Sequence, residues 1–138
     1  MGSFNRLMVQ AGEGDRRGSR TGDHMNQPLV TAVTADANTT VTAAMIAGGL
    51  VTSASKTASR TFTTDTAANI DAVFPMMNIG DVYMFQIATL DANPVVVAGG
   101  TGVTASGNLT VAANTAKECL LTKTNIVTGV GVYTLLVL

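Results

Sequence analysis

With 138 residues, the chain is long enough for one domain that buries roughly two-thirds of its unfolded surface. The formal net charge is −1 and only 12% of the residues are charged, so we expect no nucleic-acid partner. No run approaches the ~20 apolar residues of a membrane-spanning helix, and the single cysteine excludes an internal disulfide, so we expect no membrane partner and no cysteine-cluster metal site.

The composition favours strands built from small side chains. Apolar residues make up 46% of the chain but aromatic residues only 4%, and Ala, Thr and Val recur throughout. Thr and Val are β-branched and suit a pleated strand better than a helix. Small side chains remove little apolar area from water, at about 25 cal/mol per Å². Contact with further subunits would therefore stabilise such a domain.

The organisation of the chain changes near Pro28. Residues 1–28 are rich in glycine, hold half of the basic residues and have neither helical nor strand periodicity. They are either a disordered tail or an arm that becomes ordered on a partner, whose carboxylates would pair with the arginines. The candidate partner-binding residues in this arm are Arg6, Arg16, Arg17 and Arg20.

A single β-domain is predicted over residues 29–138. Strand candidates in its first half are residues 29–34, 50–54 and 60–63. Residues 39–49 favour one or two helical turns. Thr42 can cap their start, and Gly48 or Gly49 can end them in the left-handed conformation.

The strongest helix signal lies in residues 64–74. Its candidate N-caps are Thr64, Asp65 and Thr66. The residues at spacing i, i+3 and i+4, which we expect to face the core, are Ile70, Val73 and Phe74. Pro75 ends the helix, and we interpret the following Met76 and Met77 as gap-filling core residues.

The second half of the chain has the spacing of an all-β fold. Residues 81–89 carry apolar side chains on both faces near their start, which predicts a strand covered on both sides. Further strand candidates follow at residues 95–98, 109–112, 117–122 and 130–138. This spacing predicts an antiparallel β-sandwich or a jelly-roll-like barrel with one or two short helices. The apolar Val137 and Leu138 are expected to be buried in the sheet or against a neighbouring subunit.

The residues that could carry catalysis are isolated from one another. His24 lies in the glycine-rich segment, where no rigid scaffold aims it, and Cys119 lies in an apolar strand pattern typical of a buried core residue. Single carboxylates at the ends of predicted elements are typical helix caps and turn formers, and these are Asp65, Asp71, Asp81 and Asp91. We therefore expect no catalytic residues, no metal site and no enzymatic activity.

One glycine motif imitates a nucleotide-binding fingerprint. Residues 100–105 spell G-x-G-x-x-A directly after a predicted strand. The fingerprint needs a helix next, because the phosphate lies at the helix N-terminus, yet a turn and another strand follow. The glycines are therefore expected to form a tight hairpin or a corner, and no cofactor is expected.

Three segments within residues 30–138 resemble tailed-bacteriophage virion proteins of the head decoration (cement) and head-fibre kind. They read IGDVYMFQI at residues 79–87, VVAGGTGVTASGNLTVAANTA at residues 96–116 and VYTLL at residues 132–136. Gly99 and Gly100 carry one glycine more than the pattern of that family, and residues 1–28 match nothing in it.

The resemblance implies a β-sandwich or jelly-roll-like subunit without catalytic residues. Such a subunit is often a homotrimer and sits on the outer capsid surface, where its partner is the major capsid protein. We thus expect a virion protein that is synthesised in the host bacterial cytoplasm and stabilises the shell. The alternative is a β-sandwich receptor- or carbohydrate-binding module of a head or tail fibre, which would need exposed aromatic side chains.

Overall fold

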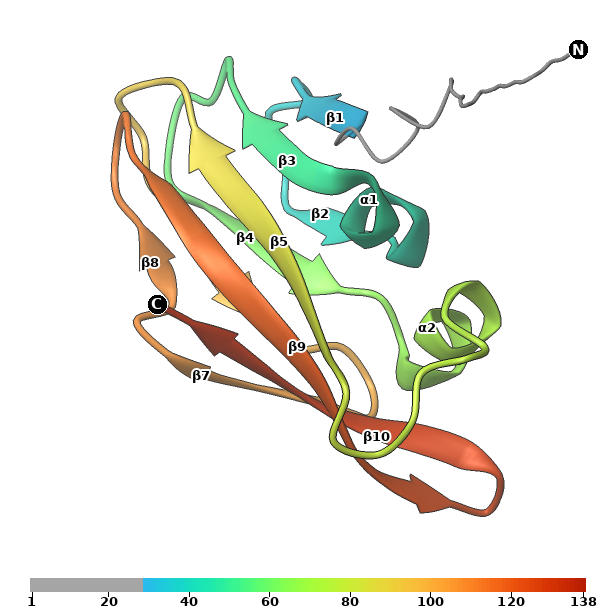
Figure 1. Ribbon diagram of the computed structural model, residues 1–138. Coiled ribbons are helices and arrows are strands. Elements are labelled where there is room, and N and C mark those ends of the chain that lie inside the picture. The colour runs from blue at the N-terminus through green and yellow to red at the C-terminus, as the bar shows by residue number, and fades with distance from the viewer. Residues whose placement is uncertain (1–28) are drawn as a thin grey trace, which may run out of the picture.

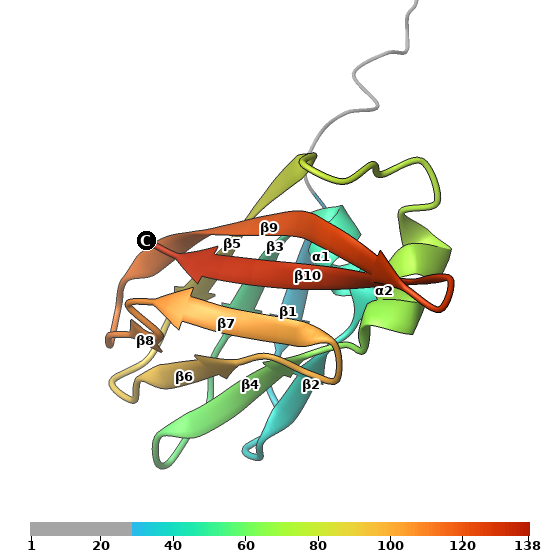
Figure 2. The same ribbon diagram turned by 90° about the horizontal axis from the view of Figure 1, so that it is seen from below.

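Residues 29–138 form two β-sheets that pack against each other. The computed structural model describes these residues, and the structural statements below refer to them alone. A six-stranded sheet crosses in front of a four-stranded sheet in Figure 1, and the two helices lie toward one end of the sheets. From the direction of Figure 2, the larger sheet curls over the smaller one. The predicted mainly β sandwich with one or two short helices is confirmed.

The strand order is β1-β3-β5-β9-β10-β7 in the larger sheet and β2-β4-β6-β8 in the smaller one. The strands of the larger sheet are β1 (Leu29–Val33), β3 (Gly49–Ser53), β5 (Val82–Thr89), β7 (Val103–Gly107), β9 (Ala116–Val127) and β10 (Val130–Val137). Those of the smaller sheet are β2 (Thr39–Val41), β4 (Arg60–Thr64), β6 (Val95–Ala98) and β8 (Thr110–Val111). The helices are α1 (Ala43–Gly48) and α2 (Ala67–Val73).

From β1 to β9 the chain alternates between the two sheets, one strand in each. From β1 to β6, each strand that returns to its sheet after one crossing runs in the same direction as its predecessor. The pairs β1–β3, β3–β5, β2–β4 and β4–β6 are therefore parallel, as is β7–β10. Only β5–β9, β9–β10 and β6–β8 are antiparallel. The sandwich thus has mixed pairing instead of the antiparallel pairing expected from the strand spacing.

Helix α1 begins and ends as its sequence predicts. The Thr42 side chain accepts a hydrogen bond from the Met45 backbone N–H at 3.3 Å, and Gly49 ends the helix with φ of 100°. The helical segment is shorter than expected, however, because residues 39–41 form β2. Two threonines and a valine in that strand fit the pleated backbone and pair with β4.

Helix α2 has Thr66 as its N-cap and ends after Val73. Ile70 is fully buried, as predicted, whereas Val73 is 41% exposed. The expectation that Val73 faces the core is wrong. The helix has only seven residues and the backbone leaves it at Phe74, so Val73 lies at an end that neither sheet covers.

Inner side chains of both sheets, together with residues of the two helices, form one apolar core. Along β10 the inward residues are fully or almost fully buried, namely Tyr133, Leu135 and Val137. Full burial of one such side chain is worth about 1.5–3 kcal/mol. Val137 is therefore buried as expected. Leu138 is 52% exposed, so residues 29–138 of one chain do not bury it.

The glycine motif is a corner that carries the chain from β6 to β7. A β-carbon at Gly99 would lie 2.1 Å from the carbonyl oxygen of Val103, and one at Gly100 would lie 2.4 Å from that of Thr64. The backbone N–H of Gly100 donates to the Thr64 hydroxyl at 2.9 Å. Strand β7 follows directly, so the motif lacks the helix that a dinucleotide site needs, and the predicted corner is confirmed.

A candidate interaction surface

The outer side of the larger sheet carries a row of apolar side chains. Met84 of β5 lies opposite Leu120 of β9, which in turn lies opposite Leu136 of β10. Met84 is 56% exposed, Leu136 is 40% exposed and Leu120 is partly buried. These strands lie side by side in Figure 1. We call these three residues the apolar row.

The residues beside the apolar row are mostly uncharged. On one side, the register places Val82, Thr122, Thr134 and Thr104 across four strands. On the other side lie Gln86 and Glu118, which pair with each other. Among the outward positions of β5, β9 and β10, Glu118 is the only charged residue. The apolar row therefore lies in a region of hydroxyl, amide and aliphatic groups.

Strand β5 has an apolar inner face and an apolar outer face. Phe85 and Ile87 are buried in the core, as the sequence predicts. Val82 and Met84, on the outer face, are each 56% exposed. The expected cover on the second face is not supplied by the described part of the chain.

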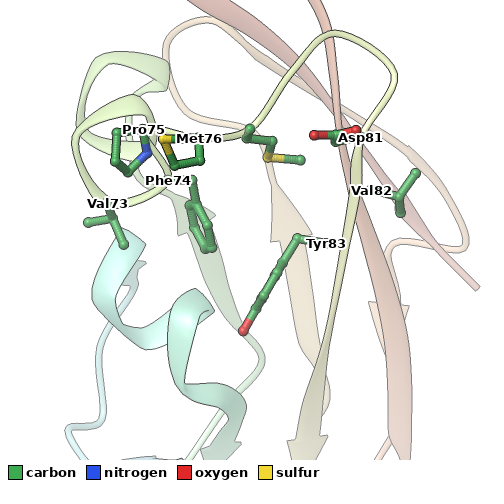
Figure 3. Close-up of a pocket in the computed structure, with 8 residues that line it drawn as sticks. Val73, Phe74, Pro75, Met76, Asp81, Val82 and Tyr83 are labelled. Atoms are coloured by element: carbon green, nitrogen blue, oxygen red, sulfur yellow. The ribbon is translucent and has the colours of Figure 1, made fainter. Parts of the chain in front are cut away.

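A shallow groove lies where α2 connects to β5, and it is also apolar (Figure 3). Its volume is about 490 Å³. The residues lining it are Val73, Phe74, Pro75, Met76, Met77, Asp81, Val82 and Tyr83. The rings of Phe74 and Tyr83 have centroids 4.8 Å apart, and the Tyr83 hydroxyl donates to the Ala47 carbonyl at 2.7 Å.

Met76 corrects the expectation of a methionine pair in the core. It is 86% exposed, whereas Met77 is partly buried and packs against the core. The physical reason is the turn that Pro75 and Met76 form after α2, which directs Met76 toward solvent. An exposed methionine beside an apolar groove is suited to contact with a partner.

A partly buried polar cluster fixes α2 to the larger sheet. The Asp71 carboxylate accepts a hydrogen bond from the Tyr133 hydroxyl and another from the Gly131 backbone N–H at 2.7 Å. The ammonium of Lys123 lies 3.5 Å from the same carboxylate and donates to the Met77 carbonyl at 3.1 Å. The cluster therefore holds both α2 and the connection that lines the groove.

The charges of this cluster explain its pKa shifts. Burial tends to raise the pKa of Asp71, but hydrogen bonds from Gly131 and Tyr133 and the charge of Lys123 outweigh it and hold the pKa below its ordinary value. Burial, together with the hydrogen bond to Asp71, raises the pKa of Tyr133. Tyr133 is fully buried, so its hydroxyl is inaccessible and the cluster is a structural tie. Its members are 60 and 62 residues apart along the chain in the two hydrogen bonds, so no local motif indicates them.

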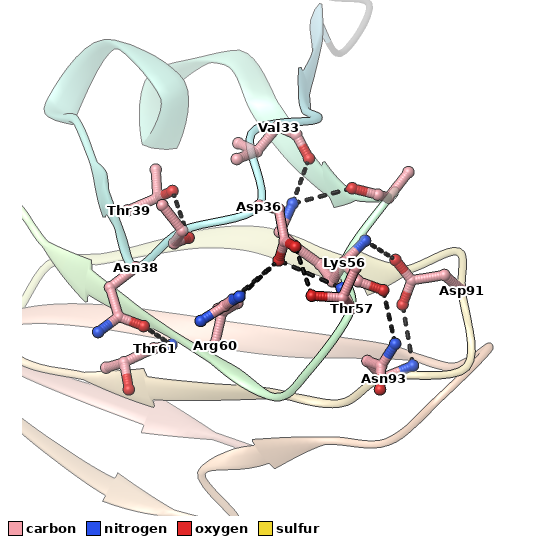
Figure 4. A network of polar contacts seen from close by, with 12 residues as sticks. Val33, Asp36, Asn38, Thr39, Lys56, Thr57, Arg60, Thr61, Asp91 and Asn93 are labelled. Carbon is pink, nitrogen blue, oxygen red and sulfur yellow. Dashed lines mark hydrogen bonds and ion pairs between the residues drawn. The ribbon is translucent and has the colours of Figure 1, made fainter.

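A second polar network joins the loops at the other end of the sheets (Figure 4). Lys56 is only 5% exposed, and its ammonium donates to the carbonyls of Val33 and Ala54 at 2.8 and 2.9 Å. Its backbone N–H donates to the Asp91 carboxylate at 2.8 Å. A lysine in a polar loop segment is normally exposed, so the sequence gives no indication of this buried one.

Asp36 extends the network across the surface. It accepts hydrogen bonds from the backbone and the hydroxyl of Thr57, and its carboxylate lies 2.8 Å from the Arg60 guanidinium. Hydrogen bonds from Thr57, aided by Arg60, lower the pKa of Asp36 to about 2. These contacts fix the loop between β3 and β4 to the loop between β1 and β2.

Three of the four carboxylates predicted to cap elements and form turns do so, whereas Asp71 lies inside α2 and binds Gly131 and Tyr133 of β10. Asp65 accepts hydrogen bonds from the Thr66 and Ala43 backbones, so it serves the starts of both helices. Asp81 accepts one from Asn78, and Asp91 accepts one from Asn93. In residues 29–138 there is no group of three or more His, Cys, Asp or Glu side chains that could hold a metal ion. In the same range, no helix is long and apolar enough to cross a membrane.

Cys119 is expected to resist thiol reagents in the folded protein. It is fully buried, and burial together with the charge of Glu118 raises its pKa to about 12, so almost no thiolate forms near neutral pH. Iodoacetamide at pH 8 should label the protein only after unfolding in guanidinium. Mass spectrometry of native and unfolded samples measures this, and rapid stoichiometric labelling of the native protein would contradict the burial.

The predicted partner-binding residues lie outside the described part of the chain. These are Arg6, Arg16, Arg17 and Arg20, and the same holds for His24. Comparisons of the chain with protein families, with curated proteins and with solved structures found no match.

Proposed function

We propose that the protein is a structural virion protein that decorates a bacteriophage capsid. In this proposal it binds the major capsid protein on the outer capsid surface, associates with itself as a homotrimer and stabilises the shell by adding interface without catalysis. It would reach the virion after synthesis in the host bacterial cytoplasm. The observation that carries the proposal is the apolar row, which residues 29–138 leave uncovered on a sheet whose inner face forms the core.

The energetics of the uncovered residues support an assembling protein. Burying a Leu, Val or Met side chain contributes about 1.5–3 kcal/mol, and several such side chains lie exposed around the row and the groove. Exposed contiguous apolar patches on soluble domains mark interaction sites. When many copies bind one shell, modest contacts combine into high avidity.

The polar clusters support the same proposal because they make the scaffold rigid. The Asp71 cluster fixes the groove, and the Lys56 network fixes the loops at the opposite end. A surface that is already ordered loses little conformational entropy on binding. Both clusters thus favour a protein that docks without rearrangement.

A second candidate function is a receptor- or carbohydrate-binding module. The observation in its favour is the pair of aromatic rings, Phe74 and Tyr83, at the groove. Sugars stack on exposed aromatic faces, but both rings are only partly exposed and the Tyr83 hydroxyl is already bonded to Ala47. A glycan array separates the candidates. A specific hit that Tyr83→Ala abolishes would favour the binding module.

Replacing the four arginines of the N-terminal segment with alanine is expected to weaken shell binding at least 10-fold. The substituted residues are Arg6, Arg16, Arg17 and Arg20. Guanidinium groups form strong bidentate pairs with carboxylates, and alanine removes both the charge and the donors. The measurement is co-sedimentation with mature capsids of the phage that encodes the chain, at several salt concentrations.

A variant with lysine at the same four positions is the matched control, because it keeps the charge and loses the bidentate geometry. We expect it to bind with intermediate affinity. Wild-type affinity of the alanine variant would remove the arginines from the interface. Failure of the wild-type protein itself to bind mature capsids would refute the proposed function.

A further inference from the structure

We propose that the outer face of the six-stranded sheet, centred on the apolar row, is the surface through which copies of this chain contact one another. The inference deepens the proposed function and rests on its statement that the protein assembles with itself. The molecule that covers this surface is a further copy of the same chain. The groove beside α2 is left free for the shell.

The first argument is the charge distribution. The row and its neighbours on one side, Val82, Thr122 and Thr134, contain no charged group. A surface without charges presents no electrostatic repulsion to a further copy of the chain. Obligate interfaces between identical subunits resemble a domain core in this respect, whereas transient interfaces are as polar as the rest of the surface.

The position of Glu118 fits the same arrangement. It lies one step along β9 from the row, where the Leu138 backbone N–H donates to its carbonyl. Lys117 donates to the Leu138 carbonyl at 3.1 Å beside it. The charged groups thus lie next to the chain end at the boundary of the apolar region. There they can stay hydrated while the row is covered.

The available area is the second argument. Strands β5 and β10 have eight residues each, and at about 3.3 Å per residue and about 4.8 Å between strands the six-stranded face measures on the order of 700 Å². A stable interface buries about 800 Å² on each partner. The sheet curls and its edge strands are shorter, so the face needs an extension.

The β9–β10 hairpin supplies that extension. Beyond the start of β5 it carries Val127 and Val130, which pair with each other and are 52% and 39% exposed. These residues continue the uncharged region along the same two strands. The face and the hairpin together approach the area of a standard interface.

The test is to place a charge in the row. Met84→Lys is expected to weaken self-association at least 100-fold, because each contact would have to bury an unpaired ammonium. Met84 is more than half exposed in the single chain, so its replacement leaves the core intact. Val96→Lys is the matched control, since Val96 is 37% exposed on the outer side of β6 in the other sheet. The measurement is molar mass by light scattering over a range of concentrations of the full chain.

The inference predicts an assembled wild-type protein, an assembled Val96→Lys variant and a single chain for Met84→Lys. Met84→Thr, which suits a strand and removes apolar area, should weaken association about 10-fold and guards against misfolding of the lysine variant. An assembly that both Met84 variants leave unchanged would overturn the inference. So would a wild-type protein that is a single chain, which is the result expected if residues 1–28 cover the face.

Capsid binding separates this inference from the proposed function. Wild-type protein that binds mature capsids, while its self-association is insensitive to Met84, would refute the surface but keep the function. Self-association that depends on Met84 without any binding to capsids would keep the surface and refute the function.

Discussion

Asp71→Ala is expected to lower the free energy of unfolding by about 3 kcal/mol. The substitution leaves the Tyr133 hydroxyl and the Gly131 N–H without their acceptor, and it removes the charge that faces Lys123. An orphaned buried donor costs about 1–3 kcal/mol. Urea denaturation at a fixed protein concentration measures the loss.

Asp81→Ala is the matched control, because Asp81 accepts a single hydrogen bond from Asn78 in an exposed turn. It should cost less than about 1 kcal/mol. Equal losses for the two variants would contradict a special role for the Asp71 cluster.

The contribution of Asp71 should also depend on pH. Its folded pKa lies below the ordinary value of 3.8, so its stabilisation is complete above that value and is lost as the pH falls through the folded pKa. The stability difference between the wild type and Asp71→Ala is therefore expected to be constant from neutral pH down to about pH 5 and to shrink in stronger acid.

Gly99→Ala is expected to prevent folding or to destabilise the domain by at least about 3 kcal/mol. The new methyl group would lie 2.1 Å from the carbonyl oxygen of Val103 and 2.9 Å from its carbonyl carbon, and both atoms belong to backbone. The corner between the sheets would have to open to relieve the contact. Circular dichroism and thermal unfolding measure the effect.

Gly129→Ala is the matched control for Gly99→Ala, because it tests backbone strain at a glycine without close packing. Gly129 has φ of 80° in the turn between β9 and β10, yet a β-carbon there would meet no atom within 4 Å. Its substitution should cost only about 1 kcal/mol, the strain of a left-handed residue. A loss at Gly99 as small as that at Gly129 would show that the corner yields easily.

Much of the fold follows from local patterns in the sequence. The cap residues Thr42 and Thr66, the left-handed Gly49 and the core-facing Ile70 lie where their side chains predict. Most strands were also predicted within a few residues, because β-branched and apolar residues alternate in them. These features depend on interactions within a few residues, which a sequence displays directly.

Features that depend on distant residues could not be predicted. Parallel pairing arises from the alternation of strands between sheets, and no single strand encodes it. Strand β2 lies in a segment predicted as helical turns, and β7 begins in the glycine motif predicted as a hairpin or corner, because each strand is short and gains its hydrogen bonds from a distant partner. The exposure of Met76 results from one turn direction, which the composition of the segment does not reveal.

The sequence predicts that an apolar outer surface exists, but it does not predict which residues of different strands meet there. An apolar outer face on residues 82–84 is visible in the sequence, and it indicates a second cover. Its alignment with Leu120 and Leu136 depends on the register of β5, β9 and β10, which only the structure gives. The proposed role of the four arginines remains a prediction.

The winding of the chain makes the domain indivisible. Because β1 to β9 alternate between the sheets, any cut between them leaves both sheets without a neighbouring strand. A fragment that ends after α2 would lack β5 and β6, which are the pairing partners of β3 and β4. Neither half can therefore fold as an autonomous module. Recombination between genes could transfer this domain only as a complete unit.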